Sequence, residues 1–567
     1  MNNNNIGQNH SGELADLLFP SVKRSVEDIF SLYPKRLLKE GALVTRFGPS
    51  PTGFTHIGGI YTALLNKKLA IQSSGRFILR IEDTDRVREV PGGTGMIIDT
   101  LNAVSLSPDE GPIGKIAFED VGDYGPYRQS SRKDIYHVFA KKLVADGFAY
   151  PCFLHQDELE KIREKQKEQK LRPGIYGEWS SYREASLETI QQKLDKNEPY
   201  VLRLKPLTGS EERRIQLNDL VRGELELPEN SLDIVLIKSD GFPTYHFAHP
   251  IDDTLMGVNL IIRGDEWIST TPIHAQLFEL LKFPKPNFAH IAPIAKMDGS
   301  SRRKLSKRKD DEASMSHYYE MGYEPTAIKE YLMNLLDSGF EDWRIANPTL
   351  SWEEFNLSLE GMGKSSSLFD WQKLNDIARD VMVKITAEQR YQKALCWAES
   401  YAPKFAATLA KDPQYANKVL NIGVHQEQPR KDLAHWSEIE QVYGYFFEDG
   451  FNQENVYKNF DEMKLANSDK LFALQYLSDN FESITQKGHD EYIANVREFA
   501  VENGFALKPK AFKKDPESFK GMWGEILMLL RVVLTGEKKT PDLYEVIQVM
   551  GSDRCQVRIK SAIDYFS

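Results

Sequence analysis

The chain has 567 residues, of which 41% are hydrophobic and 27% are charged, proportions typical of globular domains in water. Its 72 basic and 83 acidic residues give a net charge of −11, which argues against a general polyanion or DNA binder, although a local basic face remains compatible with it. No apolar run reaches the ~18 residues of a membrane span. We therefore expect a cytoplasmic protein that does not contact a membrane.

The chain contains three cysteines, Cys152, Cys396 and Cys555. They are too few and too scattered for a disulfide framework or for a zinc site made of four cysteines. His155 follows Cys152 at metal-ligand spacing, but no two further ligands lie nearby in the sequence. We expect no zinc and no other metal bound by side chains.

Residues 1–40 are interpreted as a short N-terminal extension without a core of its own. Beyond it, the hydrophobic pattern predicts a strand at 43–47, a helix at 57–72 and a second strand at 77–81. A helix between two apolar strands is the βαβ unit of a parallel sheet, which binds ligands at the carboxyl ends of its strands. We therefore assign residues 41–121 to the first half of a Rossmann-like domain.

The turn before the predicted helix is rich in proline and glycine and leads into His56, Gly58 and Gly59. The two glycines leave the first helical turn without side-chain bulk, so that an anionic ligand can approach backbone N–H groups at the positive end of the helix dipole. His56 stands where it can donate to the same ligand. This pattern indicates a phosphate site, whereas the alternative is an ordinary turn before a helix.

Residues 122–232 are predicted to form an α+β insertion, because charged helical segments there alternate with short strands such as Tyr200–Leu204. The sheet is expected to resume with a strand at 233–238, within a second half of the catalytic domain at 233–298. Polar residues then follow apolar stretches at three predicted strand ends. These residues, Glu82, Tyr245 and Arg263, predict a pocket with one acidic and one cationic group, as a zwitterionic ligand with an acidic side chain requires.

Residues 299–375 begin with the basic run Arg303–Lys309. Such a run is usually a solvated surface or a nucleic-acid patch, but this one comes directly after the last predicted strand of the sheet.

Apolar residues at helical spacing continue to the end of the chain. Residues 376–567 show no strand-rich region, which predicts an all-helical domain.

Two motifs together resemble the signatures of class I aminoacyl-tRNA synthetases in their glutamyl/glutaminyl form. The first is Arg-Phe-x-Pro-Ser-Pro-Thr-Gly-(x)2-His-Ile-Gly-Gly at 46–59, and the second is the lysine loop at 303–309. The runs at 80–85 and 218–223 also match, and the segment from Leu530 to Arg558 resembles a bacterial anticodon-binding domain. The resemblance implies an α/β Rossmann-like catalytic domain with an α+β acceptor-binding insertion, followed by an all-α anticodon-binding domain.

The resemblance also implies a reaction in which glutamate is activated by ATP with Mg2+ and transferred to tRNA-Glu, or in some members also to tRNA-Gln. The catalytic groups that it implies are His56, Gly58, Gly59, Lys304 and Lys307. The ATP-binding residues are His56, Gly58, Gly59, Glu266, Lys304, Ser306 and Lys307. The glutamate-binding residues are Arg46, Gly48, Ser50, Glu82, Tyr245, His249 and Arg263.

One position departs from the family pattern, since His249 stands where other members carry Asn or Val. A histidine facing the pocket would make glutamate binding depend on pH near its ordinary pKa of ~6.5. The alternative is a core histidine with satisfied hydrogen bonds.

Two other functions share parts of this pattern. A nucleotidyltransferase of the same superfamily that uses no tRNA would have no use for the insertion or the helical C-terminal region. An inactive tRNA-binding regulator would not need His56, Lys304 and Lys307. We therefore expect a monomeric glutamyl-tRNA-forming enzyme.

Overall fold

The structure is a computed structural model that describes residues 3–53, 55–114, 119–208, 212–306, 308–486 and 488–567. The chain divides into two compact units. The first comprises Met1–His317 and Lys329–Asp370, and the second comprises Tyr318–Ile328 and Trp371–Ser567. Helices α10 (Met315–Met321) and α11 (Pro325–Leu336) contribute residues to both units.

A βαβ element forms the centre of the first unit. Strand β1 (Val44–Phe47) runs parallel to β2 (Arg76–Leu79), and α3 (Ile57–Gln72) connects them. All four residues of β1 are buried, as expected for a parallel strand with both faces covered. The predicted bounds of the helix and of the first strand therefore agree with the structure to within a residue.

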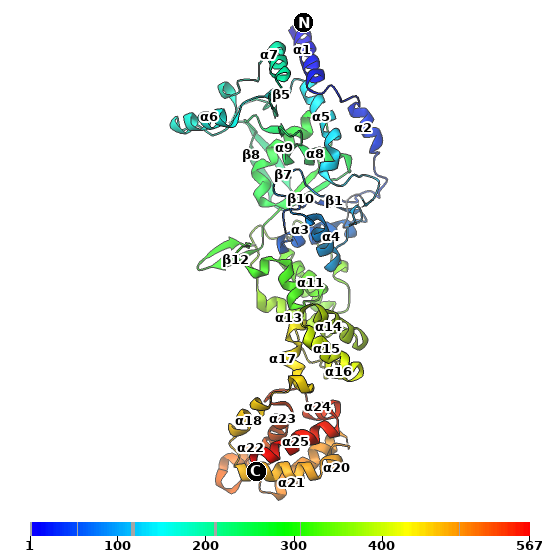
Figure 1. Cartoon of the computed structure of the whole chain (residues 1–567), viewed down its shortest axis with the longest axis vertical. Helices are drawn as coiled ribbons and strands as arrows, with labels where there is room; N and C mark the ends of the chain where they lie inside the picture. The colour runs from blue at the N-terminus through cyan, green and yellow to red at the C-terminus, as the bar shows by residue number, and fades with distance from the viewer. Residues whose placement is uncertain (1–2, 54, 115–118, 209–211, 307, 487) are drawn as a thin grey trace. The chain divides into compact units, whose positions relative to one another are not determined.

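A second parallel pair lies beside this element. Strand β10 (Leu260–Gly264) pairs with β11 (Asn287–Ile291), and the hairpin of β7 (Arg214–Asp219) and β8 (Gly223–Pro228) joins β11. Asn259, just before β10, donates its backbone N–H to the Val44 carbonyl at 3.2 Å. Figure 1 shows α3 and α4 (Gly93–Ala103) on one side of β1 and β10, with α8 (Tyr245–Leu255) and α9 (Thr271–Leu280) on the other.

Two sequence-based expectations about this sheet are wrong. The strand expected at 233–238 is β9 (Val235–Ile237), which belongs to a separate antiparallel sheet of order β5-β6-β9. Tyr245 does not follow a strand, because it begins α8. Pro250 lies inside this helix and cannot donate a helical hydrogen bond, which explains why the segment does not have the sequence pattern of a helix.

The insertion contains the rest of that separate sheet and three helices. These elements are α5 (Lys133–Ala145), β5 (Ala149–Cys152), α6 (Gln156–Glu168), α7 (Leu187–Asp195) and β6 (Val201–Leu204). Short β3 (Gly111–Pro112) and β4 (Asp120–Val121) precede them. Helix α12 (Gly339–Ala346) follows later in the first unit.

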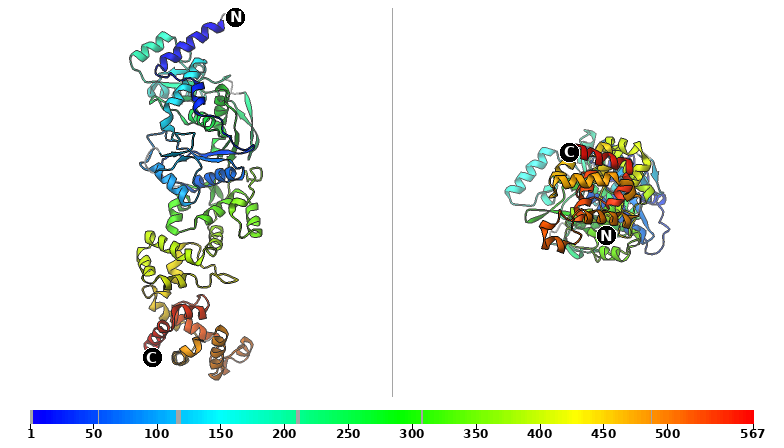
Figure 2. Two further views of the ribbon diagram at one scale, coloured as in Figure 1. Left: turned by 90° about the vertical axis from the view of Figure 1, so that its right-hand side faces the viewer. Right: turned by 90° about the horizontal axis from the view of Figure 1, so that it is seen from below.

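The N-terminal extension packs on the first unit as two helices, α1 (Asn3–Leu18) and α2 (Val26–Leu32). Figure 2 shows α1 beside α7, and α1 also contacts α5. Leu18, Phe19 and Tyr33 belong to the same buried cluster as Phe139 of α5. The extension thus shares the core of the unit that follows it.

The second unit is helical throughout the residues that the structure describes. Four of its helices, those at 453–461, 467–479, 489–502 and 552–566, pack on α23 (Trp523–Thr535), whose Ile526, Leu529 and Leu530 are buried. This helix ends before Gly536, whose φ of 74° is the left-handed conformation that favours glycine. The other helices are α13 (Trp371–Met382), α14 (Ala387–Tyr401), α15 (Pro403–Lys411), α16 (Pro413–Leu420), α17 (Ile439–Tyr443), α18 (Gln453–Asp461), α19 (Asn467–Asp479), α20 (Phe481–Thr485), α21 (His489–Glu502), α22 (Pro509–Lys514), α24 (Leu543–Met550) and α25 (Ser552–Phe566).

Candidate active site

A cavity of about 840 Å3 opens at the carboxyl ends of β1, β2 and β10. Parallel strands present their ligand-binding groups at this edge. The cavity is lined by six of the seven residues predicted to bind glutamate, namely Arg46, Gly48, Ser50, Glu82, Tyr245 and Arg263. The structure thus brings them together, while their roles in binding remain predictions.

A second cavity of about 400 Å3 shares Thr62 and Gly264 with the first. It is lined by five residues predicted to bind ATP, namely His56, Gly58, Gly59, Glu266 and Lys304. The predicted amino-acid residues and the predicted nucleotide residues therefore lie in two adjoining cavities. Two substrates bound there would meet near the end of β10.

Arg263 is held in a fixed orientation by side chains from α9, β11 and α8. Its Nε donates to His290 Nε2 at 3.0 Å, one terminal nitrogen donates to His274 Nδ1 at 3.1 Å, and the other donates to Thr271 Oγ1 at 2.9 Å. The Tyr245 hydroxyl is a more distant acceptor at 3.5 Å. Arg263 is 5% exposed, so the protein fixes the direction of its guanidinium group before any ligand binds.

These bonds also fix the protonation of the two histidines, because a guanidinium group can only donate. His290 accepts at Nε2, so its proton is on Nδ1, which donates to Asp219 at 2.6 Å. His274 accepts at Nδ1, and its Nε2 faces His246 at 2.9 Å. Burial lowers the pKa of both His274 and His290, which keeps the two rings neutral and able to accept from Arg263.

A buried charge network beneath the first cavity was not predicted from the sequence. Asp253 accepts from Arg46 Nε at 3.2 Å and from Arg80 at 2.6 Å, and Arg80 also donates to Glu82 at 2.9 Å. The side chains of Arg80 and Asp253 are fully buried. Asp253 and Arg80 therefore orient the two groups, Arg46 and Glu82, that face the cavity.

Gly48 allows the Glu82 carboxylate to lie against the turn after β1. A Cβ atom at Gly48 would stand 2.8 Å from the carboxyl carbon of Glu82, closer than real Cβ contacts. Burial raises the pKa of Glu82, although Arg80 and Arg46 oppose this effect. The glycine is thus required for the position of the acid rather than for an unusual backbone conformation.

The first turn of α3 differs from the prediction for His56 and the two glycines. The Gly58 N–H donates to His56 Nδ1 at 2.8 Å, and the Gly59 N–H donates to the His56 carbonyl at 2.8 Å. Both N–H groups that were expected to face a phosphate thus make bonds within the turn. The glycines provide space beside the cavity, and a neutral His56 carries its proton on Nε2 because Nδ1 accepts.

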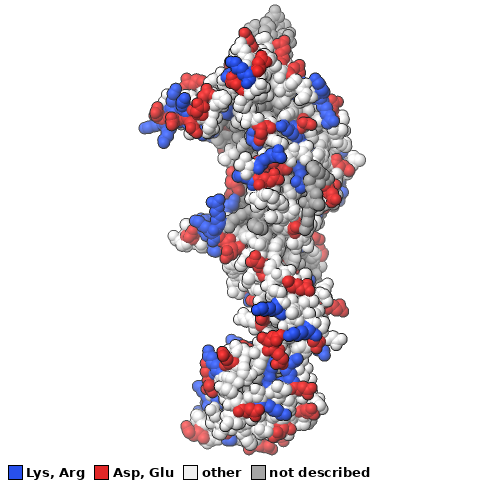
Figure 3. Space-filling view, in the orientation of Figure 1, with Lys and Arg blue, Asp and Glu red and all other residues white. Residues whose placement is uncertain are grey.

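The lysine loop follows the hairpin of β12 (Ala295–Asp298) and β13 (Ser301–Lys304). Figure 3 shows Lys and Arg side chains gathered on this hairpin, which stands out from the first unit in Figure 1. Lys304 Nζ is 2.8 Å from Glu266 Oε1, and both residues line the second cavity, so an acidic group faces the lysine there. Lys307 lies outside the described residues.

The base of the lysine loop is fixed by an ion pair that was not predicted. Arg303 donates to both carboxylate oxygens of Asp310 at 2.6 and 2.7 Å. The backbone N–H of Ser306 donates to the same carboxylate at 2.9 Å. The described residues that line either cavity do not include Ser306, so the structure links Ser306 to the shape of the loop rather than to the predicted ATP contact.

The structure corrects the prediction that His249 binds glutamate. Its side chain is fully buried behind Tyr245, with the two rings stacked 5.0 Å apart. Nδ1 bonds Asp253 at 2.9 Å. Burial lowers the pKa of His249 to about 3, although Asp253 opposes this effect. His249 is therefore a neutral core histidine, but the alternative that the sequence left open is met only in part, because Nε2 is buried without a hydrogen-bond partner among the described residues.

This low pKa predicts acid destabilisation rather than a pH-dependent glutamate affinity. The unfolded chain protonates His249 near pH 6.5, whereas the folded chain does not. The contribution of the neutral His249 to the free energy of unfolding is therefore complete above pH 6.5 and is lost progressively as the pH decreases further. Between pH 7.5 and 5.5 the loss is about 1.4 kcal/mol. In urea denaturation, His249→Asn should reduce the pH dependence by this amount, whereas His155→Asn at an exposed site should not. Equal pH dependence in both variants would contradict the assignment.

Among the described residues, no cluster of three or more His, Cys, Asp or Glu side chains could hold a metal ion. Within the same residues, no helix combines the length and the apolar character that crossing a membrane requires.

Two family models match this chain. Residues 42–376 match the family model of tRNA synthetases class I (E and Q), catalytic domain, and residues 398–563 match an anticodon binding domain. The chain therefore belongs to the class I tRNA synthetases of the E and Q type. This match confirms the expected fold class.

Relatives over nearly the full length carry a more specific name. A glutamate–tRNA ligase of Clostridium perfringens is 43% identical and one of Acetivibrio thermocellus is 42% identical, over 96% and 97% of this chain and 99% of each relative. The crystal structure of a glutamate tRNA ligase from Elizabethkingia meningosepticum in complex with its amino acid covers 93% of this chain and 100% of its own, with a TM-score of 0.73 and 27% identity.

Proposed function

We propose that this chain is a glutamate–tRNA ligase. The observation that carries the proposal is the cavity in which two guanidinium groups, of Arg46 and Arg263, and one carboxylate, of Glu82, face a common space. Glutamate offers the complementary charges, because it has two carboxylates and one ammonium group. Arginine N–H groups that face the cavity can donate charge-assisted hydrogen bonds to carboxylates, and Ser50 and Tyr245 complete the lining of the cavity.

In the first step, an oxygen of the α-carboxylate of glutamate attacks the α-phosphorus of ATP. The bond to the bridging oxygen of the β-phosphate breaks, and glutamyl-adenylate and pyrophosphate form. ATP enters as its Mg2+ complex, in which phosphate oxygens hold the metal. His56 and Lys304 donate to the phosphate oxygens that gain charge, Glu266 lies beside the nucleoside, and Lys307 is assigned to the phosphates on the family motif. Such donors act by stabilising developing charge rather than by covalent chemistry.

In the second step, a hydroxyl of the 3'-terminal adenosine of tRNA attacks the acyl carbon of glutamyl-adenylate. AMP leaves, and the ester of glutamate and tRNA remains. The insertion receives the acceptor end, and the helical region at 398–563 receives the anticodon. We propose tRNA-Glu as the substrate and a monomer acting in the cytoplasm as the functional form.

Aminoacylation with labelled glutamate, ATP and purified tRNA-Glu or tRNA-Gln tests the proposal. We expect glutamyl-tRNA-Glu to form together with AMP. If neither tRNA is charged, the proposal is wrong. Charging of tRNA-Gln as well would widen the range of substrates without changing the reaction.

A further inference from the structure

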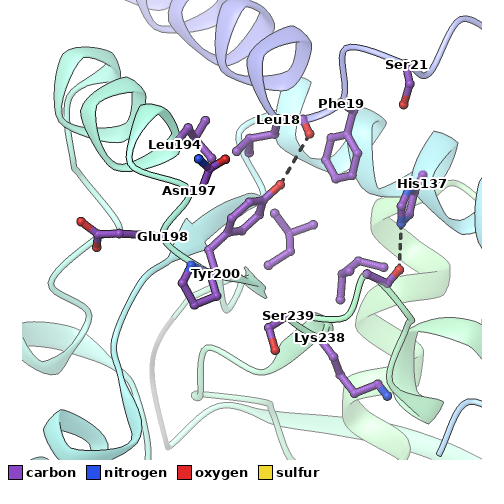
Figure 4. A pocket seen from close by; sticks show the side chains of 14 residues that line it. Leu18, Phe19, Ser21, His137, Leu194, Asn197, Glu198, Tyr200, Lys238 and Ser239 are labelled. Carbon is purple, nitrogen blue, oxygen red and sulfur yellow. Dashed lines mark hydrogen bonds between the residues drawn. The ribbon is translucent and has the colours of Figure 1, made fainter. Parts of the chain in front are cut away.

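The N-terminal extension lies outside the residues that match the family's catalytic domain, which begin at 42. It is nevertheless firmly attached to the first unit. Figure 4 shows Leu18 and Phe19 of the extension beside Tyr200 of the insertion and His137 of α5, and the Tyr200 hydroxyl donates to the Leu18 carbonyl at 3.5 Å. The segment that follows these residues leads into β1 and contains Arg36.

Arg36 uses three nitrogens to bridge two separate parts of the first unit. Its terminal nitrogens donate to the two carboxylate oxygens of Glu110 at 2.6 and 2.7 Å, while Nε donates to the Met256 carbonyl at 2.7 Å. The guanidinium carbon lies 3.8 Å from the centre of the Tyr124 ring. The side chains of Arg36 and Glu110 are 9% and 10% exposed, so solvent screens this ion pair weakly.

One side of the bridge leads to Glu82. Glu110 accepts from the Tyr127 hydroxyl at 2.8 Å, and its backbone carbonyl accepts from the Leu79 N–H at 2.9 Å. The Tyr127 carbonyl in turn accepts from the Ile81 N–H at 2.9 Å. The backbone on both sides of Arg80 is thus fixed by groups that Arg36 holds, and the next residue after Ile81 is Glu82.

The other side of the bridge leads to α8. The carbonyl that Arg36 binds belongs to Met256, the residue directly after the last turn of this helix. Helix α8 begins with Tyr245, which lines the cavity, and contains Asp253, which holds Arg46. One guanidinium group outside the matched catalytic domain therefore connects the strand end that carries Glu82 with the helix that orients Arg46.

We propose that Arg36 is a positioning residue for the glutamate cavity. It holds the end of β2 and the end of α8 at a fixed separation, so that Glu82 and Arg46 face the amino acid together. The N-terminal extension thereby takes part in substrate recognition without touching the substrate. This inference rests on the proposed glutamate activation.

The test compares Arg36→Met with Lys35→Met, an exposed neighbour of similar length, in full-length protein. Pyrophosphate exchange in the presence of tRNA gives KM separately for glutamate and for ATP. Arg36→Met should raise KM for glutamate about tenfold and change KM for ATP by less than about twofold, because only the glutamate cavity loses its alignment. Lys35→Met should match the wild type.

Two further variants separate positioning from stability. Arg36→Lys keeps the charge and the stem but cannot form the paired bonds to Glu110, so it should restore the melting temperature without restoring KM for glutamate. Combined with Glu82→Gln, Arg36→Met should raise KM for glutamate by clearly less than tenfold, since the part of its effect that acts through Glu82 is then already lost and the two changes are not additive.

Several results would overturn the inference. These are an unchanged KM for glutamate in Arg36→Met, an equal rise in KM for ATP, full recovery of KM by Arg36→Lys, or the full tenfold effect in the Glu82→Gln background. If Arg36→Met does not fold, Arg36→Lys alone decides, because its KM for glutamate must then exceed that of Lys35→Met. Absence of exchange in both the wild type and Lys35→Met would instead contradict the proposed function.

Discussion

Replacing Arg263 with methionine is expected to lower kcat/KM for glutamate by about a thousandfold, or ~4 kcal/mol. The guanidinium group lines the amino-acid cavity and is held by His290, His274 and Thr271. Methionine fills a similar volume but cannot donate to a substrate carboxylate. The loss should appear in glutamate-dependent pyrophosphate exchange, and KM for ATP serves as the internal reference because Arg263 does not line the nucleotide cavity.

Arg263→Lys is the matched variant for this prediction. A lysine ammonium retains the charge but not the planar fork, so we expect it to recover only a small part of the lost activity. If Arg263→Met keeps kcat/KM for glutamate within tenfold of the wild type, or if KM for ATP rises as much as KM for glutamate, Arg263 does not bind the amino acid.

The second large effect is expected from Lys304→Met, which should lower kcat of adenylate formation by about a hundredfold or more. Lys304 lines the nucleotide cavity at the end of β13 and pairs with Glu266. We expect its ammonium group to leave that carboxylate for the phosphates when ATP binds, and then to stabilise the charge that develops in the transition state. KM for glutamate should change little.

Two variants serve as controls for Lys304. Lys309→Met removes a cation of the same type from within the loop, at a position that is not among the described residues lining either cavity, and should retain most of the activity. Glu266→Gln removes the partner of Lys304 but not Lys304 itself, so it should retain a larger fraction of kcat than Lys304→Met does. A similar loss in Lys309→Met and Lys304→Met would show that the loop acts only through its total charge.

The central element could be predicted from the sequence because local signals agree there. The signals for a strand, a proline-rich turn and a helix follow one another within a short stretch of sequence. Helix α3, which begins after His56, has the predicted bounds. Arg46 and Arg263 lie near the carboxyl ends of β1 and β10, and Glu82 lies just after β2, so the geometry of a parallel sheet places them near one another. Tyr245 lines the predicted cavity, but it lies at the start of a helix and not at the end of a strand.

The groups that orient these residues could not be predicted in the same way. Asp253 lies 207 positions from Arg46, and Glu110 lies 74 positions from Arg36. Spacing along the chain shows which residues share a face of one element, but not which distant charged groups meet in the core. The burial of His249 could not be predicted for the same reason. The residues next to a histidine in α8 do not indicate whether its side chain faces a cavity or the core.

The most direct test of glutamate recognition by this chain is pyrophosphate exchange by the wild-type protein with tRNA-Glu and ATP. The measurement compares glutamate with glutamine at equal concentration. Glutamine has the same shape as glutamate but lacks one of the two carboxylates that Arg46 and Arg263 are assigned to bind. We expect exchange that depends on glutamate and is absent or minimal with glutamine. No exchange with glutamate, or equal exchange with both amino acids, would contradict this expectation.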